Sequence, residues 1–261
     1  MLIGHHYTSI DTFISILEST NIWAANLRNM NDPNEGAFGL DRLRNLIQKQ
    51  YDTCLSNSTP DLDCFSVSFS LEDDVLSQWR AYANDGTGVS IGFDLDMLDQ
   101  FITPTIDTVP FTSQIVNVKY GDEDFLGNAN RFLSDKNFHD NPDEINLFVR
   151  FEQYAYKDLF YKEESEVRLV AELPNPLKFE RGCLYQDQYK KTVHERVSPY
   201  GLTKYLHFQH SCRATTQTSI KSIRLGPKCP LGIEDVKYLL FKHGVGDYNT
   251  IKIAHSNGNY R

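Results

Sequence analysis

The residues best suited to chemistry lie in three short segments, and one of these carries paired carboxylates. Residues 163–169 read Glu-Glu-Ser-Glu-Val-Arg-Leu. If this segment is a strand, alternation places Glu164, Glu166 and Arg168 on one face. Neighbouring carboxylates raise each other's pKa when desolvated, and an adjacent arginine offsets that rise. Such a pair can hydrogen-bond sugar hydroxyls and stabilise a developing cation, but it also suits a solvated edge strand whose charges discourage aggregation.

The second segment is His6-Tyr7-Thr8-Ser9, which follows a short apolar run and precedes a helical pattern. A histidine and a tyrosine at a strand end could bind ribose hydroxyls and stack on a planar ring. The alternative is structural, because Thr8 and Asp11 fit a capping box and His6 can simply pack. Both interpretations stay open.

The third segment is a strand with a hydroxyl-lined face. Ser66, Ser68 and Ser70 alternate with aromatic and aliphatic residues, as a half-buried strand requires. A serine face suits the floor of a cleft, or an exposed sheet face that tolerates serine. The following helix carries Trp79 and Tyr82 at helical spacing, which favours packing in the core over stacking on a ligand.

These segments belong to a chain in which strands and helices follow one another without a linker. The expected strands are 2–7, 64–70, 89–94, 114–120, 163–172, 220–225 and 250–254. The expected helices are 10–19, 33–51, 75–83, 96–101, 142–157 and one that ends at Gly244. Residues 174–219 are expected to be irregular with short strands. We therefore expect a single α+β domain over residues 1–261, with the Asp-, Asn- and Gly-rich residues 121–143 as a mobile insertion.

Composition limits the class of protein. The chain has 261 residues, 40% of them hydrophobic, and a formal net charge of −9. This charge argues against strong non-specific nucleic-acid binding, which depends on neutralising phosphates, but a small anionic ligand needs only a local cluster of donors. No apolar run is long enough to span a membrane, and the N-terminus lacks a signal peptide. Five cysteines without a CxxC motif favour a reducing cytoplasm.

Two other motifs have structural explanations. In Asn31-Asp32-Pro33-x-Glu35, Asp32 fits the N-cap position and Glu35 the third position of a helix. Whether these two carboxylates are caps or site residues stays open. The clustered histidines, His5-His6 and His207-x-x-His210, have no nearby cysteine or carboxylate partner, so we predict no metal site.

Taken together, the motifs resemble the bacterial domain-of-unknown-function family 2971 over nearly the whole chain. The residues that carry this resemblance are His6-Tyr7-Thr8-Ser9, Asn31-Asp32-Pro33-x-Glu35, the Ser-x-Ser strand before Trp79-x-x-Tyr82-Ala83, Gly88 with Gly92-Phe93-Asp94, Glu164-x-Glu166-x-Arg168 and Ile223-x-Leu225-Gly226-Pro227. More distantly, the order of a His strand, a Ser-x-Ser strand and a Glu-x-Glu strand resembles the ADP-ribosyltransferase superfamily. That resemblance implies a split pair of small, mostly antiparallel sheets, flanked by helices, with NAD as the substrate between them.

The second resemblance also implies roles for individual residues. Glu166 would hold the ribose 2′-hydroxyl and stabilise the oxocarbenium-like transition state as nicotinamide leaves, Glu164 would assist the acceptor, and His6 would bind the nicotinamide ribose. Tyr7 or Tyr82 would stack on the nicotinamide. The residues expected to bind NAD are His6, Tyr7, Thr8, Ser66, Ser68, Tyr82 and Arg168.

The chain departs from that superfamily in one respect. Subgroups with Glu-x-Glu usually carry Arg on the first strand, whereas this chain has His6. The acceptor of ADP-ribose (protein, nucleic acid or water) therefore stays open, as do two other functions. One is a non-catalytic nucleotide-sensing or protein-interaction module on the same fold. The other is a hydrolase or nuclease that uses Glu164, Glu166 and His6 with a metal. The leading hypothesis is an ADP-ribosyltransferase-like enzyme acting as a toxin or phage-defence effector.

Overall fold

The computed structural model describes residues 1–27, 45, 62–102, 112–134, 152, 154–177, 186–198, 201–212 and 217–258. The predicted helix at 33–51, with Asp32 and Glu35 at its start, lies outside the described residues apart from the single position 45. Most of the predicted helix at 142–157 also lies outside them. Its last two positions form a short strand, so that part of the prediction is wrong.

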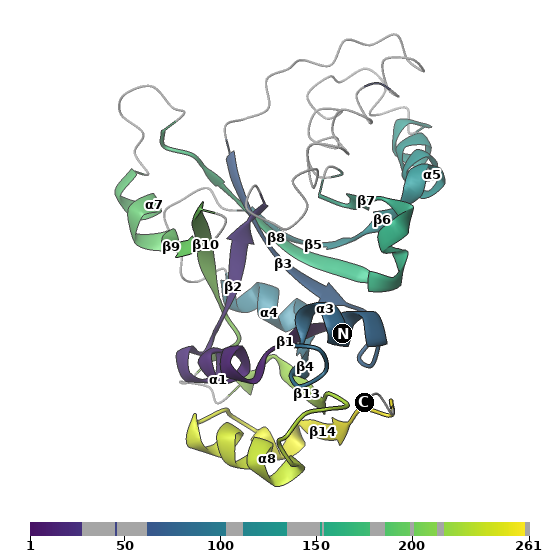
Figure 1. Ribbon diagram of the computed structural model, residues 1–261. Helices are drawn as coiled ribbons and strands as arrows, with labels where there is room; N and C mark the ends of the chain where they lie inside the picture. Colours follow the sequence, from purple (N-terminus) through teal and green to yellow (C-terminus); the bar gives the residue numbers. More distant parts are fainter. Residues whose placement is uncertain are drawn as a thin grey trace.

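Ten of the described strands form one mixed sheet (Figure 1). Eight follow the order β14 (Lys252–His255), β13 (Ile220–Leu225), β4 (Val89–Asp94), β1 (Ile3–Thr8), β3 (Leu62–Ser70), β2 (Asn21–Asn26), β10 (Gly201–Gln209) and β9 (His194–Ser198). β8 (Glu166–Pro174) branches from β3, and β5 (Thr112–Asn117) pairs with β8. Only the β13–β14 pair in this sheet is parallel. The mixture of helices with mostly antiparallel strands is confirmed, but the expected pair of separate small sheets is a single sheet.

The strand β3 is the centre of this arrangement, because it pairs on both edges. Along one edge it pairs with β8 at nine positions, from Leu62 opposite Pro174 to Ser70 opposite Glu166. Along the other edge it pairs with β2 at Phe65 and Ser66 and with β1 at Ser70. The described strands therefore leave residues 67–69 of this edge without a strand partner. β1 and β2 diverge from β3 there.

Helices cover the sheet and connect its strands. They are α1 (Ile10–Ser19), α3 (Leu76–Tyr82), α4 (Leu95–Ile102), α5 (Gly121–Ser134), α7 (Gln186–Thr192) and α8 (Ile233–Lys242), with 3-10 helices η3 (Leu159–Glu164) and η4 (Tyr248–Thr250). The short strand pairs are β6 (Lys119–Tyr120) with β7 (Tyr156–Lys157), and β11 (Ser211–Cys212) with β12 (Gln217–Thr218). In the described part of the chain, none of the helices has the length and apolar character that crossing a bilayer needs.

Three sequence predictions need correction here. Thr8 does not cap α1, because it ends β1 opposite Val89, and Ser9 is the N-cap that accepts from the Thr12 amide. The first fourteen residues of the expected insertion at 121–143 form helix α5. The region 174–219 contains the nine-residue strand β10, whose alternating buried positions include Leu206 and Phe208.

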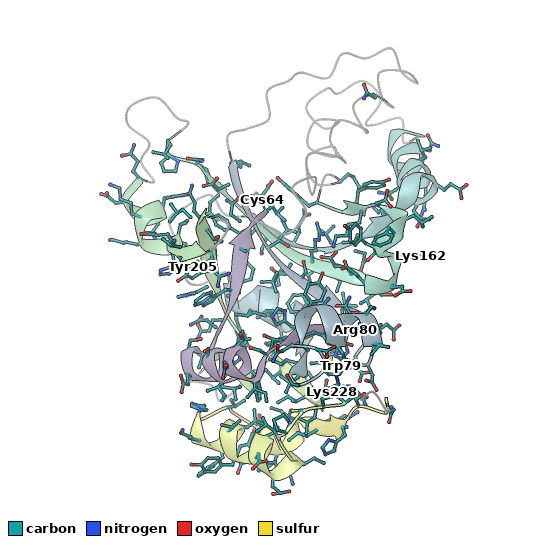
Figure 2. All side chains as sticks on the ribbon, in the orientation of Figure 1. Cys64, Trp79, Arg80, Lys162, Tyr205 and Lys228 are labelled. Carbon is teal, nitrogen blue, oxygen red and sulfur yellow. The ribbon has the colours of Figure 1, made fainter. Side chains whose placement is uncertain are left out.

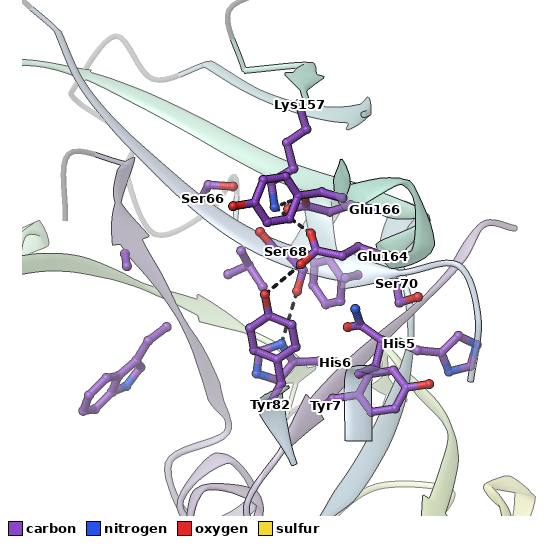
Figure 3. Close-up of a pocket in the computed structure, with 16 residues that line it drawn as sticks. His5, His6, Tyr7, Ser66, Ser68, Ser70, Tyr82, Lys157, Glu164 and Glu166 are labelled. Carbon is purple, nitrogen blue, oxygen red and sulfur yellow. Dashed lines mark hydrogen bonds and ion pairs between the residues drawn. The ribbon is translucent and has the colours of Figure 1, made fainter. Parts of the chain in front are cut away.

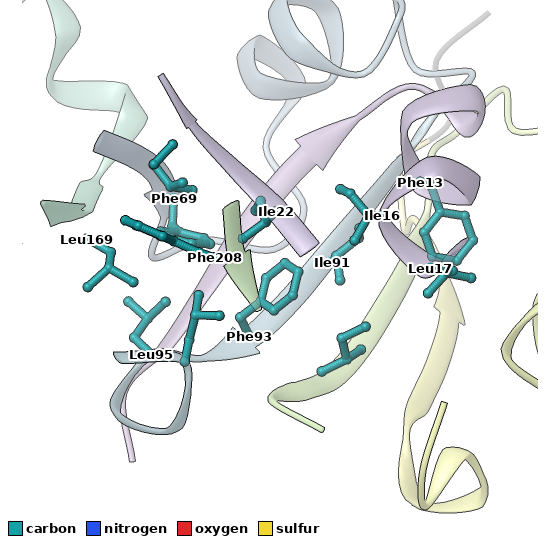
Figure 4. Close-up of a cluster of buried hydrophobic side chains, with 14 of the residues drawn as sticks. Phe13, Ile16, Leu17, Ile22, Phe69, Ile91, Phe93, Leu95, Leu169 and Phe208 are labelled. Carbon is teal, nitrogen blue, oxygen red and sulfur yellow. The ribbon is translucent and has the colours of Figure 1, made fainter. Parts of the chain in front are cut away.

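The hydrophobic core lies between the sheet and its helices (Figure 4). Phe65, Val67 and Phe69 are at most 3% exposed, as predicted for the apolar face of β3, but Ser66 and Ser70 are buried as well, so the strand is not half-buried. The core also includes Phe93 from β4 and Phe208 from β10. Burial of these large side chains stabilises the strands that diverge at β3, since fully burying one such side chain contributes roughly 1.5–3 kcal/mol.

Gly88 lies where the end of β1 and the turn after α3 approach each other closely. A Cβ at this position would collide with the Thr8 carbonyl oxygen and lie 3.0 Å from the Ala83 carbonyl oxygen. Because both obstacles are backbone atoms, we expect Gly88→Ala to lower the free energy of unfolding in urea by about 3 kcal/mol, the upper part of the usual range for overpacking. Gly127→Ala is the control, because nothing lies within 4 Å of that Cβ on helix α5. Equal stability of the two variants would contradict this prediction.

Candidate functional site

A cavity of about 310 Å³ opens at the point where β1 and β2 diverge from β3. Seven of the predicted site residues line it, from five separate elements (Figure 3). They are His6, Tyr7, Ser66, Ser68, Tyr82, Glu164 and Glu166. The volume is at the lower end of the roughly 300–1,000 Å³ that is usual for small-molecule sites. The structure thus brings together residues up to 160 positions apart in the chain (6 to 166).

Two predicted NAD-binding residues do not line the cavity. Thr8 is 5% exposed and lies in β1, where it pairs with β4. Arg168 is fully buried behind Glu166, and it donates from Nε to Oε1 at 2.7 Å and from Nη2 to Oε2 at 3.0 Å. Its third hydrogen bond, from Nη1, goes to the Tyr154 carbonyl at 3.2 Å. Arg168 therefore positions Glu166 and has no surface in the cavity.

Glu166 is held as a carboxylate. It is the first residue of β8, and its side chain is 6% exposed. Burial alone would raise its pKa, but Arg168 and Lys157, together with the Ser68 hydroxyl on the neighbouring strand, lower the pKa of Glu166 to about 2. Lys157 Nζ lies 2.9 Å from Glu166 Oε2. A carboxylate has about four lone-pair positions, and Arg168 and Lys157 occupy three of them.

Glu164 reaches the cavity from a turn rather than from the strand that the alternation predicted. It is the last residue of η3, and Ser165 then takes a left-handed conformation with φ 43° before β8 begins. The Tyr82 hydroxyl donates to Glu164 Oε1 at 2.9 Å, and Lys157 Nζ donates to Oε2 at 2.6 Å. Two lone-pair positions on this carboxylate are not occupied by any residue that the structure describes. The sharp turn at Ser165 therefore lets both Glu164 and Glu166 line the cavity, although only Glu166 lies in the strand.

Lys157 is the site residue that the sequence did not reveal. It lies in β7, which pairs with β6, and its Nζ contacts both carboxylates and lies 5.1 Å from the centre of the Tyr161 ring. The surrounding sequence predicted the end of a helix at this position. A single lysine there belongs to no motif that would indicate a role in the site. Lys157 and Arg168 together balance the two negative charges of the cavity.

His6 has a defined tautomer. Its Nδ1 lies 3.3 Å from the Ser68 carbonyl oxygen, which can only accept, so Nδ1 carries the proton. Burial lowers the pKa of His6, which keeps the ring neutral near pH 7. The second nitrogen, Nε2, then offers a lone pair, and none of the described residues donates to it. A neutral imidazole in this position can accept a hydrogen bond from a sugar hydroxyl.

The neutral state of His6 predicts a pH dependence of stability. Because its folded-state pKa lies below the ordinary 6.5, His6 contributes stability above that pH, and the contribution falls as the pH drops below 6.5. We expect His6→Gln to lose less free energy of unfolding between pH 7 and pH 5 than the wild type, measured by urea titration at each pH. His255→Gln, at an exposed position, should keep the wild-type slope. Identical slopes for His6→Gln and wild type would refute this account.

The two candidate tyrosines differ in how far they are already engaged. Tyr7 donates to the Glu72 carbonyl at 2.9 Å, accepts from the Val75 amide at 3.1 Å and packs edge-on against Trp79 at 4.7 Å. Trp79 is 1% exposed, which confirms its prediction as a core residue. Tyr82, which was also expected to pack in the core, is instead 44% exposed, so its ring is the better candidate for stacking on a ligand.

The serine face of β3 contributes two hydroxyls without a hydrogen-bond partner among the described residues, those of Ser66 and Ser68. Ser66 and Ser70 are 2% and 3% exposed, so the face is enclosed and does not form an open sheet surface. Ser70 Oγ accepts from the Glu72 amide at 3.1 Å. Ser66 Oγ is buried and has no hydrogen-bond partner among the described residues. Buried hydroxyls are normally paired, so Ser66 is available to a ligand in the cavity.

The clustered histidines do not converge. His210 is fully buried and bonds the Ile16 carbonyl at 3.0 Å through Nε2, whereas His207 lies on the opposite face of β10. The imidazole of His5 lies against Gly92, away from His6 (Figure 3). Within the residues that the structure describes, no three His, Cys, Asp or Glu side chains form a group that could hold a metal ion.

Comparison with known proteins gives one match. A family model described as "Protein of unknown function (DUF2971)" matches residues 78–169, about a third of the chain. This segment includes Trp79, Tyr82, Glu164, Glu166 and Arg168. No curated protein and no solved structure matches the chain. The prediction of the domain-of-unknown-function family 2971 is therefore confirmed for residues 78–169, rather than for nearly the whole chain.

Proposed function

We propose that the protein is an NAD-dependent ADP-ribosyltransferase-like enzyme that cleaves the bond between nicotinamide and ribose and passes ADP-ribose to an acceptor. One observation carries this proposal. His6, Glu164 and Glu166 come from three different elements and line one cavity with the serine face of β3. A binding module without chemistry does not require this convergence, whereas cleavage of an N-glycosidic bond requires both orientation and negative charge at one point.

The cavity offers matched groups for the nicotinamide riboside half of NAD. The exposed ring of Tyr82 can stack on nicotinamide, and the hydroxyl of Ser66 and the Nε2 lone pair of His6 can bind ribose hydroxyls. Each of these polar atoms lacks a hydrogen-bond partner among the described residues. A ligand hydroxyl would therefore gain a bond without displacing an existing one.

The hydrogen bonds that each carboxylate already accepts favour roles for Glu164 and Glu166 that differ from those implied by the resemblance to the superfamily. Glu166 is nearly saturated by Arg168 and Lys157, so it supplies fixed negative charge beneath the reacting carbon. Glu164 keeps two lone-pair positions and is the carboxylate that a ribose 2′-hydroxyl or an acceptor can reach. As the bond breaks, nicotinamide leaves with the bonding electrons as a neutral base. The acceptor then attacks the ribose cation, and Glu164 takes the acceptor's proton.

The direct test is incubation of the purified protein with NAD in the presence of total cell protein and total RNA. We expect release of nicotinamide and a labelled ADP-ribose adduct on one of the two fractions, or free ADP-ribose if water is the acceptor. Expression in a bacterial host should slow growth if the enzyme is a toxin or a phage-defence effector. Absence of both NAD binding and nicotinamide release would reject the proposal.

A second candidate, a non-catalytic nucleotide-sensing module, is favoured by the charge balance of the cavity. Lys157 contacts both carboxylates at 2.6 and 2.9 Å, and Arg168 neutralises Glu166. This pairing reduces the negative charge that could stabilise a cationic transition state. The sensor predicts NAD binding without nicotinamide release, so the same incubation separates the two functions.

A further inference from the structure

A row of ring side chains lies on the sheet beside the cavity and is not explained by the nicotinamide end of a substrate. The Trp23 and Tyr205 rings stack at 4.3 Å, and the His194 and His207 rings stack at 4.2 Å. The guanidinium of Arg196 lies 5.4 Å from the centre of the Trp23 ring. We call these five side chains, on β2, β10 and β9, the aromatic platform.

Strand register explains why the platform forms. Trp23 is opposite His207, and Tyr205 is opposite both Ala25 and His194. These residues therefore point to one face of the sheet, and Tyr205 can be followed on β10 in Figure 2. The intervening residues on the opposite face, among them Leu206, are buried in the core.

The platform is exposed and continuous with the cavity. The Trp23 residue is 45% exposed, although tryptophan is usually well buried. Trp23 and Ala25 both line the cavity that contains His6 and Glu164. Arg196 is exposed, and none of the described carboxylates forms a salt bridge with it. A planar stack with an adjacent exposed cation is the chemistry that holds a nucleobase and a phosphate.

The size of the cavity indicates what must lie on the platform. At about 310 Å³, the cavity is at the lower limit for a small molecule and suits one nucleoside. A ligand with two linked nucleosides would have to place the second outside. Of the cavity walls, the one formed by Trp23 and Ala25 leads directly onto the aromatic platform.

We propose that the aromatic platform is a second subsite, which binds the distal nucleobase of the dinucleotide substrate against Trp23 and Tyr205, with Arg196 on a phosphate. This inference rests on the proposed function, since it presupposes that a nicotinamide dinucleotide occupies the cavity. It assigns the adenosine half of the substrate to β2, β10 and β9, whereas the reacting half lies between β1, β3 and β8.

Tryptophan fluorescence tests this subsite directly. The chain has two tryptophans, and Trp79 is 1% exposed, so quenching by iodide reports mainly on Trp23. We expect NAD and adenosine monophosphate to protect Trp23 from iodide. Nicotinamide mononucleotide, which lacks the distal base, should bind the cavity and leave most of the quenching unchanged.

Affinity measurements by calorimetry extend the test to variants. Removal of an aromatic ring that stacks on a base weakens binding by about 5- to 150-fold, so Trp23→Ala should weaken NAD binding by that factor. Because Trp23 also lines the cavity, nicotinamide mononucleotide binding should weaken too, but by a smaller factor. Trp23→Phe should retain most of the affinity, and Arg196→Ala should weaken NAD binding as well. Tyr238→Ala is the control, because Tyr238 is a 61% exposed aromatic residue on helix α8, outside the platform.

The outcomes separate this inference from the proposed function. If NAD binds and is cleaved but Trp23→Ala binds it normally, the subsite is wrong and the function stands. If adenosine monophosphate protects Trp23 while nicotinamide mononucleotide does not bind and NAD is not cleaved, the function is wrong and the nucleobase subsite stands. Protection of Trp23 by a single-stranded RNA oligonucleotide, but not by NAD or adenosine monophosphate, would overturn the assignment to the substrate. Protection by none of these ligands would overturn the subsite, and the nicotinamide-release assay would then decide the proposed function separately.

Discussion

Glu164→Gln should reduce the rate of nicotinamide release from NAD by about 10²- to 10⁴-fold, the range for loss of a positioned general base. The amide cannot take a proton from the acceptor, and it carries no charge to stabilise the ribose cation. Tyr82 can still donate to the amide oxygen, so the cavity should keep its shape. The measurement is single-turnover nicotinamide release at saturating NAD, together with NAD affinity from calorimetry.

The matched control is Glu163→Gln, one residue earlier in the chain and exposed to solvent. It removes the same charge from η3 without touching the cavity, so it should release nicotinamide at the wild-type rate. If Glu164→Gln retains the wild-type rate as well, Glu164 has no catalytic role. If neither variant nor wild type releases nicotinamide while all three bind NAD, the sensor function is the correct one.

Glu166→Gln should lower the free energy of unfolding by about 3–5 kcal/mol, because it breaks a buried ion pair by removing the charge of one partner. Arg168 is fully buried and donates a short hydrogen bond to each carboxylate oxygen of Glu166. Urea unfolding followed by circular dichroism measures this change. Loss of activity in Glu166→Gln would therefore report on folding as well as chemistry, which makes Glu164→Gln the cleaner catalytic test.

Two comparisons isolate the cause of this destabilisation. The double variant Glu166→Leu with Arg168→Met removes both charges, so it should be more stable than Glu166→Gln alone. In wild type, the lowered pKa of Glu166 means that its contribution is present above about pH 4.5 and is lost as the pH falls towards 2. That loss amounts to about 3 kcal/mol. An unchanged free energy of unfolding in Glu166→Gln would show that Arg168 does not depend on this partner.

The aromatic platform and the cavity differ in how far sequence reasoning could find them. The chemical residues of the cavity lie in motifs whose spacing is visible in the chain, such as Glu164-x-Glu166 and Ser66-x-Ser68. The platform joins Trp23 to Tyr205 across 182 positions, through the pairing of β2 with β10 (205 minus 23). The alternation of Leu206 and Phe208 signalled a strand in the region taken as irregular, but no local pattern identifies the partner of a strand.

By itself, the sequence determined which side of several elements faces the core. Alternation in residues 64–70 identified the strand with Phe65 and Phe69 inward, and helical spacing placed Trp79 in the core. These predictions succeeded because the face on which a side chain lies depends only on the side-chain periodicity of its own helix or strand. The positive φ of Asn84 and Asp85 after α3 has a similar local origin, because Asn and Asp tolerate the left-handed conformation in turns.

Only the tertiary structure decided how the site is assembled. It brought Glu164 into the cavity from a left-handed turn at Ser165, placed Lys157 between the two carboxylates and made one sheet of the expected pair. Among the described strands, it also left residues 67–69 of β3 without a partner on one edge, which is where the cavity opens. The physical reason is that strand pairing and register are set by contacts between residues far apart in the chain, which side-chain periodicity within one segment does not encode.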